Sequence, residues 1–213
     1  MPPSFDELRV EYLDAPLDRT DLDDNPVVQL ARWIEEAGHA GVVEPNAFVL
    51  STSGPDHRPS GRTVLLKGLT DEGLVFFTNY RSRKGAELAH NPLASAVFVW
   101  TAIRRQVRVE GRVEKVPDVV SDAYFASRPP EARLASAASP QSEVVATREA
   151  LEARLEALRR QFPDGEVPRP AHWGGYRLSP DNFEFWQGRQ ARFHDRFMYS
   201  WNGQDWRVDR LAP

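Results

Sequence analysis

The sequence contains no cysteine, and this absence excludes several kinds of chemistry. Without thiols there is no disulfide, no zinc–thiolate or iron–sulfur site and no thiol nucleophile. The sequence also has no apolar run approaching the roughly 18 residues of a membrane-spanning helix. Residues Met1 to Glu7 lack the apolar stretch of a secretion signal. We therefore expect a cytoplasmic protein with no membrane partner, which agrees with the reducing compartment that a lack of cysteine favours.

The sequence also lacks an excess of basic over acidic residues. Lysine and arginine number 27 against 31 aspartate and glutamate, which gives a formal net charge of −4. Nucleic-acid binding depends on cations that displace counterions from phosphates, so we expect no nucleic-acid partner. The sequence has no phosphate-loop, nucleophile-elbow or His-Glu-x-x-His motif, and its 5 histidines lack metal-ligand spacing. We therefore expect no metal site.

The composition that remains is that of a globular domain. Of the 213 residues, 41% are hydrophobic and 27% charged, and a domain of this size buries about 70% of its unfolded surface. We expect a single domain over residues 1–213, with residues 1–25 as a mobile or extended N-terminal segment. Asn25-Pro26 then predicts a helix start, with asparagine as the cap and proline at the first helical position. Gly38 and Gly41 mark its end.

Short apolar runs separated by turn residues follow from Asn46 onward. Within 106–116, valines alternate with polar residues, which is typical of a strand with one buried face. Asn202-Gly203 between two aromatic runs indicates a hairpin. The predicted strands are 47–52, 62–67, 74–78, 94–100, 106–116, 175–178, 183–186 and 192–200, and the predicted helices after the first are 82–91, 118–127 and 146–162. This order favours an α+β, mainly β protein: an antiparallel, Greek-key-like β-barrel with flanking helices.

Cationic side chains gather at the ends of the predicted strands and helices. Arg62 and Lys67 bracket one strand, and Arg83 and Lys84 follow Ser82 at a helix start, where backbone N–H groups favour an anion. Singly, each is more often a solvated surface group. Together they indicate an anion site.

A second polar group is expected near the C-terminus. Arg192, His194 and Arg196 occupy alternate positions of the predicted strand 192–200, so their side chains should project to one side, near Trp186. Arginine binds phosphate bidentately and stacks on rings. This group therefore suits a planar, anionic ligand.

Segments along nearly the whole chain match one known family in order. They are RTVLLKG (62–68), FFTN (76–79) with SRK (82–84), RQVRVEG (105–111), YF (124–125) with SRP (127–129), SPQS (139–142), WGGY (173–176), FWQG (185–188), RFHDR (192–196) and DRLAP (209–213). On these segments the chain resembles the pyridoxine/pyridoxamine 5′-phosphate oxidases, FMN-dependent enzymes with a split-barrel fold. The resemblance implies FMN as cofactor and a homodimer with FMN at the interface.

The resemblance also implies roles for individual residues. FMN would contact Arg62, Thr63, Val64, Leu65, Leu66, Lys67, Phe77, Thr78, Arg83, Lys84, Gln106, Gln141, Ser142, Trp186 and Arg196. The substrate phosphate would lie near Lys67, Tyr124 and Arg128, and the catalytic pair Arg192 and His194 would face the substrate ring. Arg9 and Tyr12 would belong to a segment that closes over the substrate.

One segment departs from the family pattern. Between Pro130 and Ala137, the family's phosphate-contacting serine is replaced by Ala132, a glycine by Ala135 and a tryptophan by Ala137. Glu131 would bring a negative charge near the phosphate, for which Arg133 could compensate. The segment therefore bears on the identity of the substrate.

Three functions are consistent with these residues. The first is an FMN-dependent oxidase that uses O2 to convert pyridoxine or pyridoxamine 5′-phosphate to pyridoxal 5′-phosphate, with transfer of a hydride from C4′ to flavin N5 and release of H2O2. The second is a related flavin oxidase that acts on another small molecule, such as a phenazine-type intermediate. The third is a non-catalytic FMN-binding protein, which would have no need for Arg192 and His194.

Overall fold

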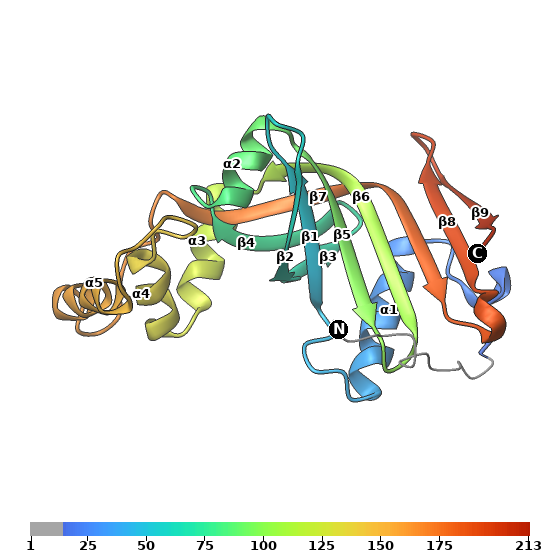
Figure 1. The fold of residues 1–213 in the computed structure, drawn as a ribbon, viewed down its shortest axis with the longest axis horizontal. Coiled ribbons are helices and arrows are strands. Elements are labelled where there is room, and N and C mark those ends of the chain that lie inside the picture. The colour runs from blue at the N-terminus through green and yellow to red at the C-terminus, as the bar shows by residue number, and fades with distance from the viewer. Residues whose placement is uncertain (1–14) are drawn as a thin grey trace, which may run out of the picture. The chain divides into compact units, whose positions relative to one another are not determined.

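The structure of the protein is a computed structural model, and residues 15–213 of it are described (Figure 1). Its elements are, in order, η2 (Arg19–Asp21), α1 (Pro26–His39), β1 (Ala47–Ser53), β2 (Pro59–Leu65), β3 (Gly68–Thr70), β4 (Gly73–Asn79), α2 (Arg83–His90), β5 (Leu93–Trp100), β6 (Arg105–Lys115), α3 (Asp118–Ser127), α4 (Pro130–Ala138), α5 (Arg148–Gln161), β7 (Trp173–Gln187), η3 (Gln190–Arg192), β8 (Asp195–Trp201) and β9 (Trp206–Leu211).

The strands form a nine-stranded sheet with the order β2-β1-β5-β6-β7-β4-β3, to which β8 is added on β7 and β9 on β8. The pairs β1–β2, β3–β4, β4–β7, β7–β8 and β8–β9 are antiparallel. Long β7 pairs with β4 through its first half and with β8 through its second half. The predicted fold class, a mainly β antiparallel split barrel with flanking helices, is therefore confirmed.

The described chain divides into two compact units. The first contains the described residues up to Asn46 together with Val97–Val109 and Asp181–Pro213, and the second contains Ala47–Ala96 and Glu110–Pro180. The single domain over 1–213 remains a prediction.

The first unit has an aromatic core between α1 and the C-terminal strands. The Trp33 ring of α1 meets Phe185 of β7 edge-on, with ring centroids 5.1 Å apart, and Phe185 packs against Tyr199 of β8 at 5.4 Å. All three side chains are buried. The Tyr199 hydroxyl donates to the Asp23 carbonyl at 2.7 Å, so a polar group in this core has a partner.

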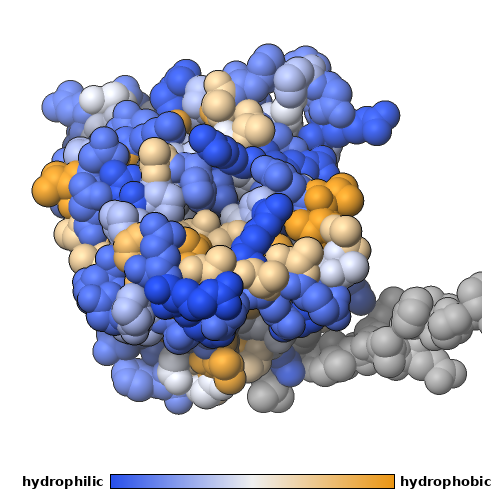
Figure 2. Space-filling view, turned by 90° about the vertical axis from the view of Figure 1, so that its left-hand side faces the viewer, coloured by the Kyte–Doolittle hydropathy of each residue, from blue (hydrophilic) through white to orange (hydrophobic). Residues whose placement is uncertain are grey.

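The second unit packs its strands around Phe48, Phe76 and Tyr176. The rings of Phe48 and Phe76 lie 6.0 Å apart, and those of Phe76 and Tyr176 5.7 Å apart. Helices α3, α4 and α5 gather together in this unit (Figure 1). Helix α5 has no buried residue, and Figure 2, which views the molecule from the side where α5 lies in Figure 1, shows mostly hydrophilic residues.

Several elements that local sequence signals predicted are present in the structure. The Asn25 side chain accepts a hydrogen bond from the Val27 N–H at 2.9 Å, so α1 begins as its capping sequence predicts. Helix α3 has the predicted bounds, 118–127. The hairpin at Asn202-Gly203 is present, but its connection spans 202–205, because Trp201 pairs with Trp206.

Other elements differ from prediction. The expected extended lead-in contains the short helix η2, whose N-terminal end is capped by Asp18 and Asp21. The two strands expected at 175–178 and 183–186 are one strand, β7, with Pro180 between its two ladders. Strand β3 and helix α4 were not predicted; α4 begins at Pro130, the second residue of a proline pair that is typical of a connection.

Candidate active site

The second unit contains an open cavity of about 860 Å³. This volume lies in the range of small-molecule sites. The walls come from β2 and the connection after it, β4, the start of α2, α3, α4, the loop that follows α4 and the first residue of β7. The cavity is lined by Ser60, Gly61, Arg62, Thr63, Val64, Leu65, Lys67, Phe77, Thr78, Asn79, Arg83, Lys84, Tyr124, Arg128, Ala132, Ala135, Ser136, Ser139, Gln141, Ser142 and Trp173.

The charge of this lining has one sign. Its ionisable side chains include Arg62, Lys67, Arg83, Lys84 and Arg128, and no aspartate or glutamate is among the described residues that line it. Such a surface attracts anions, most strongly a phosphate, which can accept several charge-assisted hydrogen bonds. The cavity therefore suits a ligand with at least one phosphate.

The start of α2 forms one end of the cavity. The Ser82 side chain caps the helix by accepting from the Gly85 N–H. The first two helical residues, Arg83 and Lys84, line the cavity, so the positive end of the helix adds to their charge there. Gly85 is required here, because a Cβ atom at this position would lie 2.1 Å from the Tyr80 carbonyl oxygen.

Lys84 is the most enclosed cation of this site, with 8% of its surface exposed. Its ammonium group donates to Thr78 Oγ1 at 2.9 Å, to Ser82 Oγ at 3.2 Å and to Gln141 Oε1 at 3.0 Å. Burial, together with the charge of Arg62, lowers the pKa of Lys84 to about 8. A buried cation whose contacts are neutral oxygens is stabilised by an anion, so the residues present fit a phosphate-bearing cofactor.

Arg62 is held by a carboxylate that the sequence did not reveal. Glu87 of α2 is 7% exposed; it lies 3.3 Å from Arg62 Nη2 and accepts from Thr52 Oγ1 at 2.5 Å and Ser60 Oγ at 2.6 Å. Burial raises the pKa of Glu87, but the hydrogen bonds from Ser60, Thr52 and Arg83 and the charge of Arg62 lower it to about 2. The only sequence signal for Glu87 is its position four residues after Arg83, on the same helix face.

A second part of the cavity wall is aromatic. The rings of Phe77 and Tyr124 are stacked with centroids 3.9 Å apart, and Trp173 lies parallel to Phe77 at 5.7 Å. The Arg128 guanidinium lies over the Trp173 ring at 4.8 Å and donates to Ser136 Oγ at 2.7 Å. Burial lowers the pKa of Arg128, but guanidinium groups stay charged in proteins. A fixed cation therefore faces the cavity beside flat rings.

The segment that departs from the family pattern is helix α4. Its residues Ala132, Ala135 and Ser136 line the cavity, whereas Arg133 is bound to Glu166 by two hydrogen bonds of 3.1 and 2.9 Å. The idea that Arg133 compensates for the altered segment is therefore wrong, because its guanidinium is engaged by Glu166 and it does not line the cavity.

Glu131 also has a partner away from the lining residues. Its carboxylate accepts from Arg159 of α5 at 2.6 Å, and this hydrogen bond lowers the pKa of Glu131. The expected negative charge near a bound phosphate is thus paired with Arg159, and Glu131 is not among the residues that line the cavity.

The remaining predicted site residues of the described chain lie in the first unit, except Leu66, which is buried in the second. Those in the first unit are Gln106, Trp186, Arg192, His194 and Arg196. Arg196 pairs with the buried Glu184 at 2.8 Å. Arg9 and Tyr12 lie outside the described residues.

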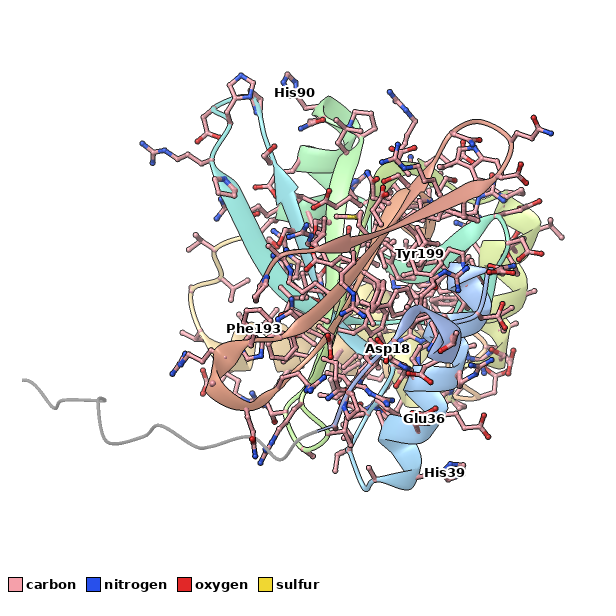
Figure 3. All side chains as sticks on the ribbon, turned by 90° about the vertical axis from the view of Figure 1, so that its right-hand side faces the viewer. Asp18, Glu36, His39, His90, Phe193 and Tyr199 are labelled. Atoms are coloured by element: carbon pink, nitrogen blue, oxygen red, sulfur yellow. The ribbon has the colours of Figure 1, made fainter. Side chains whose placement is uncertain are left out.

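The expected strand 192–200 begins later than predicted, at Asp195. Arg192 ends the short helix η3, and Ala191 and Arg192 have φ values of 52° and 60°. These left-handed residues turn the chain before β8, so Arg192, His194 and Arg196 do not share one strand. Phe193, labelled in Figure 3, is exposed at this turn.

His194 nevertheless stays close to Trp186. Their ring centroids are 4.5 Å apart, and His194 Nδ1 accepts from the Arg189 N–H at 3.1 Å. Burial and the charge of Arg192 lower the pKa of His194, partly opposed by Asp195. Since Nδ1 is the acceptor of this hydrogen bond, Nε2 carries the proton of the imidazole and can donate a hydrogen bond.

No group of three histidine, aspartate or glutamate residues in the described chain is placed to hold a metal ion. No helix of residues 15–213 is long and apolar enough to cross a membrane.

Comparison with protein families gives two matches. Residues 34–162 match the family model described as pyridoxamine 5′-phosphate oxidase. Residues 173–213 match the model described as the pyridoxine 5′-phosphate oxidase C-terminal dimerisation region. Together the two matches span most of the chain, and the second includes β7, β8 and β9.

Proteins with similar sequences are described as pyridoxine/pyridoxamine 5′-phosphate oxidases, in agreement with the family matches. The chain is 50% identical over 208 residues to a pyridoxine/pyridoxamine 5′-phosphate oxidase of Nostoc sp., with 97% of each chain covered. It is 51% identical over 206 residues to one of Rubrobacter xylanophilus, covering 97% of this chain and 95% of the relative.

Among solved structures, PhzG from Burkholderia lata in complex with tetrahydrophenazine-1-carboxylic acid superposes with a TM-score of 0.88. It is 33% identical, and the match covers 94% of this chain and 99% of that one. A pyridoxamine 5′-phosphate oxidase-related, FMN binding protein from Nostoc punctiforme has the same fold, with a TM-score of 0.68, 22% identity and coverage of 84% and 95%.

The curled antiparallel sheet and these structural neighbours define the chain as a split-barrel protein of the kind related to pyridoxamine 5′-phosphate oxidase. More particularly, the chain belongs to the pyridoxine/pyridoxamine 5′-phosphate oxidase family and is an oxidoreductase.

Proposed function

We propose that the protein is an FMN-dependent oxidase that converts pyridoxine or pyridoxamine 5′-phosphate to pyridoxal 5′-phosphate. The observation that carries this proposal is that Lys67, Tyr124 and Arg128 line the same cavity as Arg83 and Lys84. One cavity thus offers cations for two phosphate groups, one on the cofactor and one on the substrate. The curated relatives of about the same length support this substrate class.

In this proposal, the cofactor phosphate is held by the start of α2. Lys84 and Arg83 supply charge, and Ser142 and Gln141 supply polar contacts from the loop after α4. The full proposed cofactor set is Arg62 to Lys67, Phe77, Thr78, Arg83, Lys84, Gln106, Gln141, Ser142, Trp186 and Arg196. Bound FMN would accept a hydride from substrate C4′ at N5 and pass the electrons to O2, which yields H2O2.

The substrate would be oriented by groups at its two ends. Lys67, Tyr124 and Arg128 would bind its phosphate, and Arg192 and His194 would contact its ring. His194 can donate its Nε2–H to an oxygen substituent of the ring, since Nδ1 already accepts from Arg189, and Arg192 can lie over the ring face. Holding the flat substrate in one orientation is the main contribution of these side chains, because reaction requires C4′ close to the flavin.

The test is turnover by the FMN-loaded protein. Pyridoxine 5′-phosphate and O2 should yield pyridoxal 5′-phosphate and H2O2 in equal amounts, and unphosphorylated pyridoxine should react far more slowly. Arg128→Ala should raise KM for the phosphate ester by at least about tenfold, because a charge-assisted hydrogen bond is lost. Arg154→Ala, which removes an exposed arginine of α5, is the control. An FMN-loaded sample without turnover contradicts the proposal.

A second candidate is oxidation of a phenazine-type intermediate. It is favoured by the 33% identity to PhzG over 94% of this chain and by the small side chains at Ala132 and Ala135 in the cavity wall. A reduced phenazine carboxylic acid and pyridoxine 5′-phosphate should be compared as substrates. Oxidation of the phenazine acid alone would replace the first proposal with this one.

A further inference from the structure

Helix α4 presents one hydroxyl group to the part of the cavity where Arg128 lies, the proposed binding place of the substrate phosphate. Ala132 and Ser136 lie four residues apart, one helical turn, and both line the cavity. Residues at this spacing share a helix face. The residue that directly follows Ala132, Arg133, is bound to Glu166 instead. The geometry of α4 thus exposes positions 132 and 136 together, and only the second carries a polar side chain.

Ser136 is in direct contact with the cation expected to bind the substrate phosphate. Its Oγ accepts from Arg128 Nη1 at 2.7 Å. The guanidinium is also held against the Trp173 ring at 4.8 Å. Neither contact neutralises the charge of Arg128, as a carboxylate partner would. Ser136 therefore fixes Arg128 while leaving its charge available to an anion.

A serine hydroxyl can accept and donate at the same time. When its oxygen accepts from Arg128, its proton can be given to a second acceptor. An oxygen of a phosphate bound by Arg128 is such an acceptor, since it lies next to the same guanidinium. The Arg128–Ser136 pair would then offer two donors to one phosphate from one side.

We propose that Ser136 is a substrate-binding residue that, together with Arg128, selects for a phosphorylated substrate. The proposal rests on the proposed function. It also gives the altered segment a physical meaning: a hydroxyl at position 136 takes the place of one at position 132, one turn earlier on the same face. The chain would thus keep a phosphate site despite Ala132.

The test measures binding rather than turnover alone. The probe is 4′-deoxypyridoxine 5′-phosphate, which lacks the reacting hydroxyl, and the reference is unphosphorylated 4′-deoxypyridoxine. In the FMN-loaded protein, Ser136→Ala should raise the Kd of the phosphorylated probe about tenfold, since the lost hydrogen bond is to a charged group. The Kd of the reference should not change, and kcat with pyridoxine 5′-phosphate should stay within about twofold.

Two further variants make the test specific. Ala132→Ser combined with Ser136→Ala returns a hydroxyl to the same helix face and should recover most of the lost affinity. Ser127→Ala removes a nearby exposed hydroxyl that donates to the Tyr124 carbonyl at 2.8 Å and should leave the Kd unchanged.

The outcomes separate this proposal from the previous one. If the wild-type protein prefers the phosphorylated probe and Ser136→Ala binds it equally well, the role of Ser136 is overturned while the proposed function stands. If the wild-type protein does not distinguish the two probes, the proposed substrate class itself is wrong.

Discussion

Lys84 carries a charge into a largely buried position at the start of α2. Its lowered pKa of about 8 means that the folded protein loses this proton between about pH 8 and 10.5, where the unfolded chain keeps it. Folding stability at this site therefore increases with pH in that window. The affinity of the site for an anion decreases as the pH rises through this window, because the neutral amine of Lys84 no longer attracts a phosphate.

We expect the Kd of riboflavin 5′-phosphate to rise about tenfold between pH 7 and pH 9, as Lys84 loses its proton. In Lys84→Met, binding should be weaker at pH 7 and nearly independent of pH over this range. Flavin fluorescence quenching measures both, with riboflavin as the control without phosphate. The same pH dependence in wild type and variant would show that another group is responsible.

Glu87 is the buried carboxylate that orders Arg62 and the start of α2. Since its pKa falls from 4.5 to about 2 on folding, it contributes stability that is fully present above about pH 4.5 and is lost as the pH falls towards 2. Glu87→Gln should lower the free energy of unfolding at pH 7 by about 2–4 kcal/mol, because Arg62 would lose its buried partner.

The variant should also show a weaker loss of stability between pH 5 and pH 2 than the wild type, in urea unfolding at each pH. Glu152→Gln is the matched control, since Glu152 pairs with Arg148 in an exposed pair of the same acid–arginine type. That change should cost about 0.5 kcal/mol or less. An equal effect of the two substitutions would contradict the account of Glu87.

At the scale of elements, the contact of α2 with Tyr80 fixes where the helix begins. In Gly85→Ala, the new Cβ would meet the Tyr80 backbone at 2.1 Å, so the helix start and Lys84 would have to move. We expect a loss of about 3 kcal/mol in urea unfolding, together with weaker binding of riboflavin 5′-phosphate.

Gly38→Ala in α1 is the control for this change. A Cβ there meets nothing nearer than Pro45 Cγ at 3.6 Å, and alanine favours a helix by about 0.5–1 kcal/mol. This variant should be slightly more stable than the wild type. A Gly85→Ala protein of wild-type stability would show that the approach to Tyr80 is not close in solution.

Elements with a local cause were predictable from the sequence, and those that depend on distant contacts were not. The Asn25 cap predicted α1, and alternating valines predicted β6. Helix α4 has few local signals; Leu134 is buried in a cluster with Phe125 and Trp173, so distant residues stabilise it. The turn at Arg192 was missed because left-handed φ values at non-glycine residues leave no sequence pattern.

The candidate site was predictable to a similar extent. Arg62, Lys84 and Arg128 were identified through the family motifs, and all three line the cavity. Glu87 and Ser136 were not identified, because their roles depend on which side chains the fold brings to Arg62 and Arg128.

At the scale of the whole molecule, residues 173–213 match a dimerisation region, and we expect a homodimer. Light scattering should give twice the chain mass of 24.1 kDa. Phe193, 76% exposed within this region, is a large apolar side chain that a partner chain would cover. Phe193→Asp should therefore weaken the dimer, whereas Val43→Asp, at an 87% exposed loop position outside the region, should not. A wild-type monomer at micromolar concentration would contradict this expectation.

Trp173 lines the cavity with its ring beneath the Arg128 guanidinium and parallel to Phe77. Indole emission responds to nearby charge and to the approach of a flavin. Any molecule that engages Arg128 should therefore alter the intrinsic fluorescence of the protein. Site occupancy could thus be followed in real time and without a label, and Trp173→Phe would remove the part of the fluorescence change that comes from this ring.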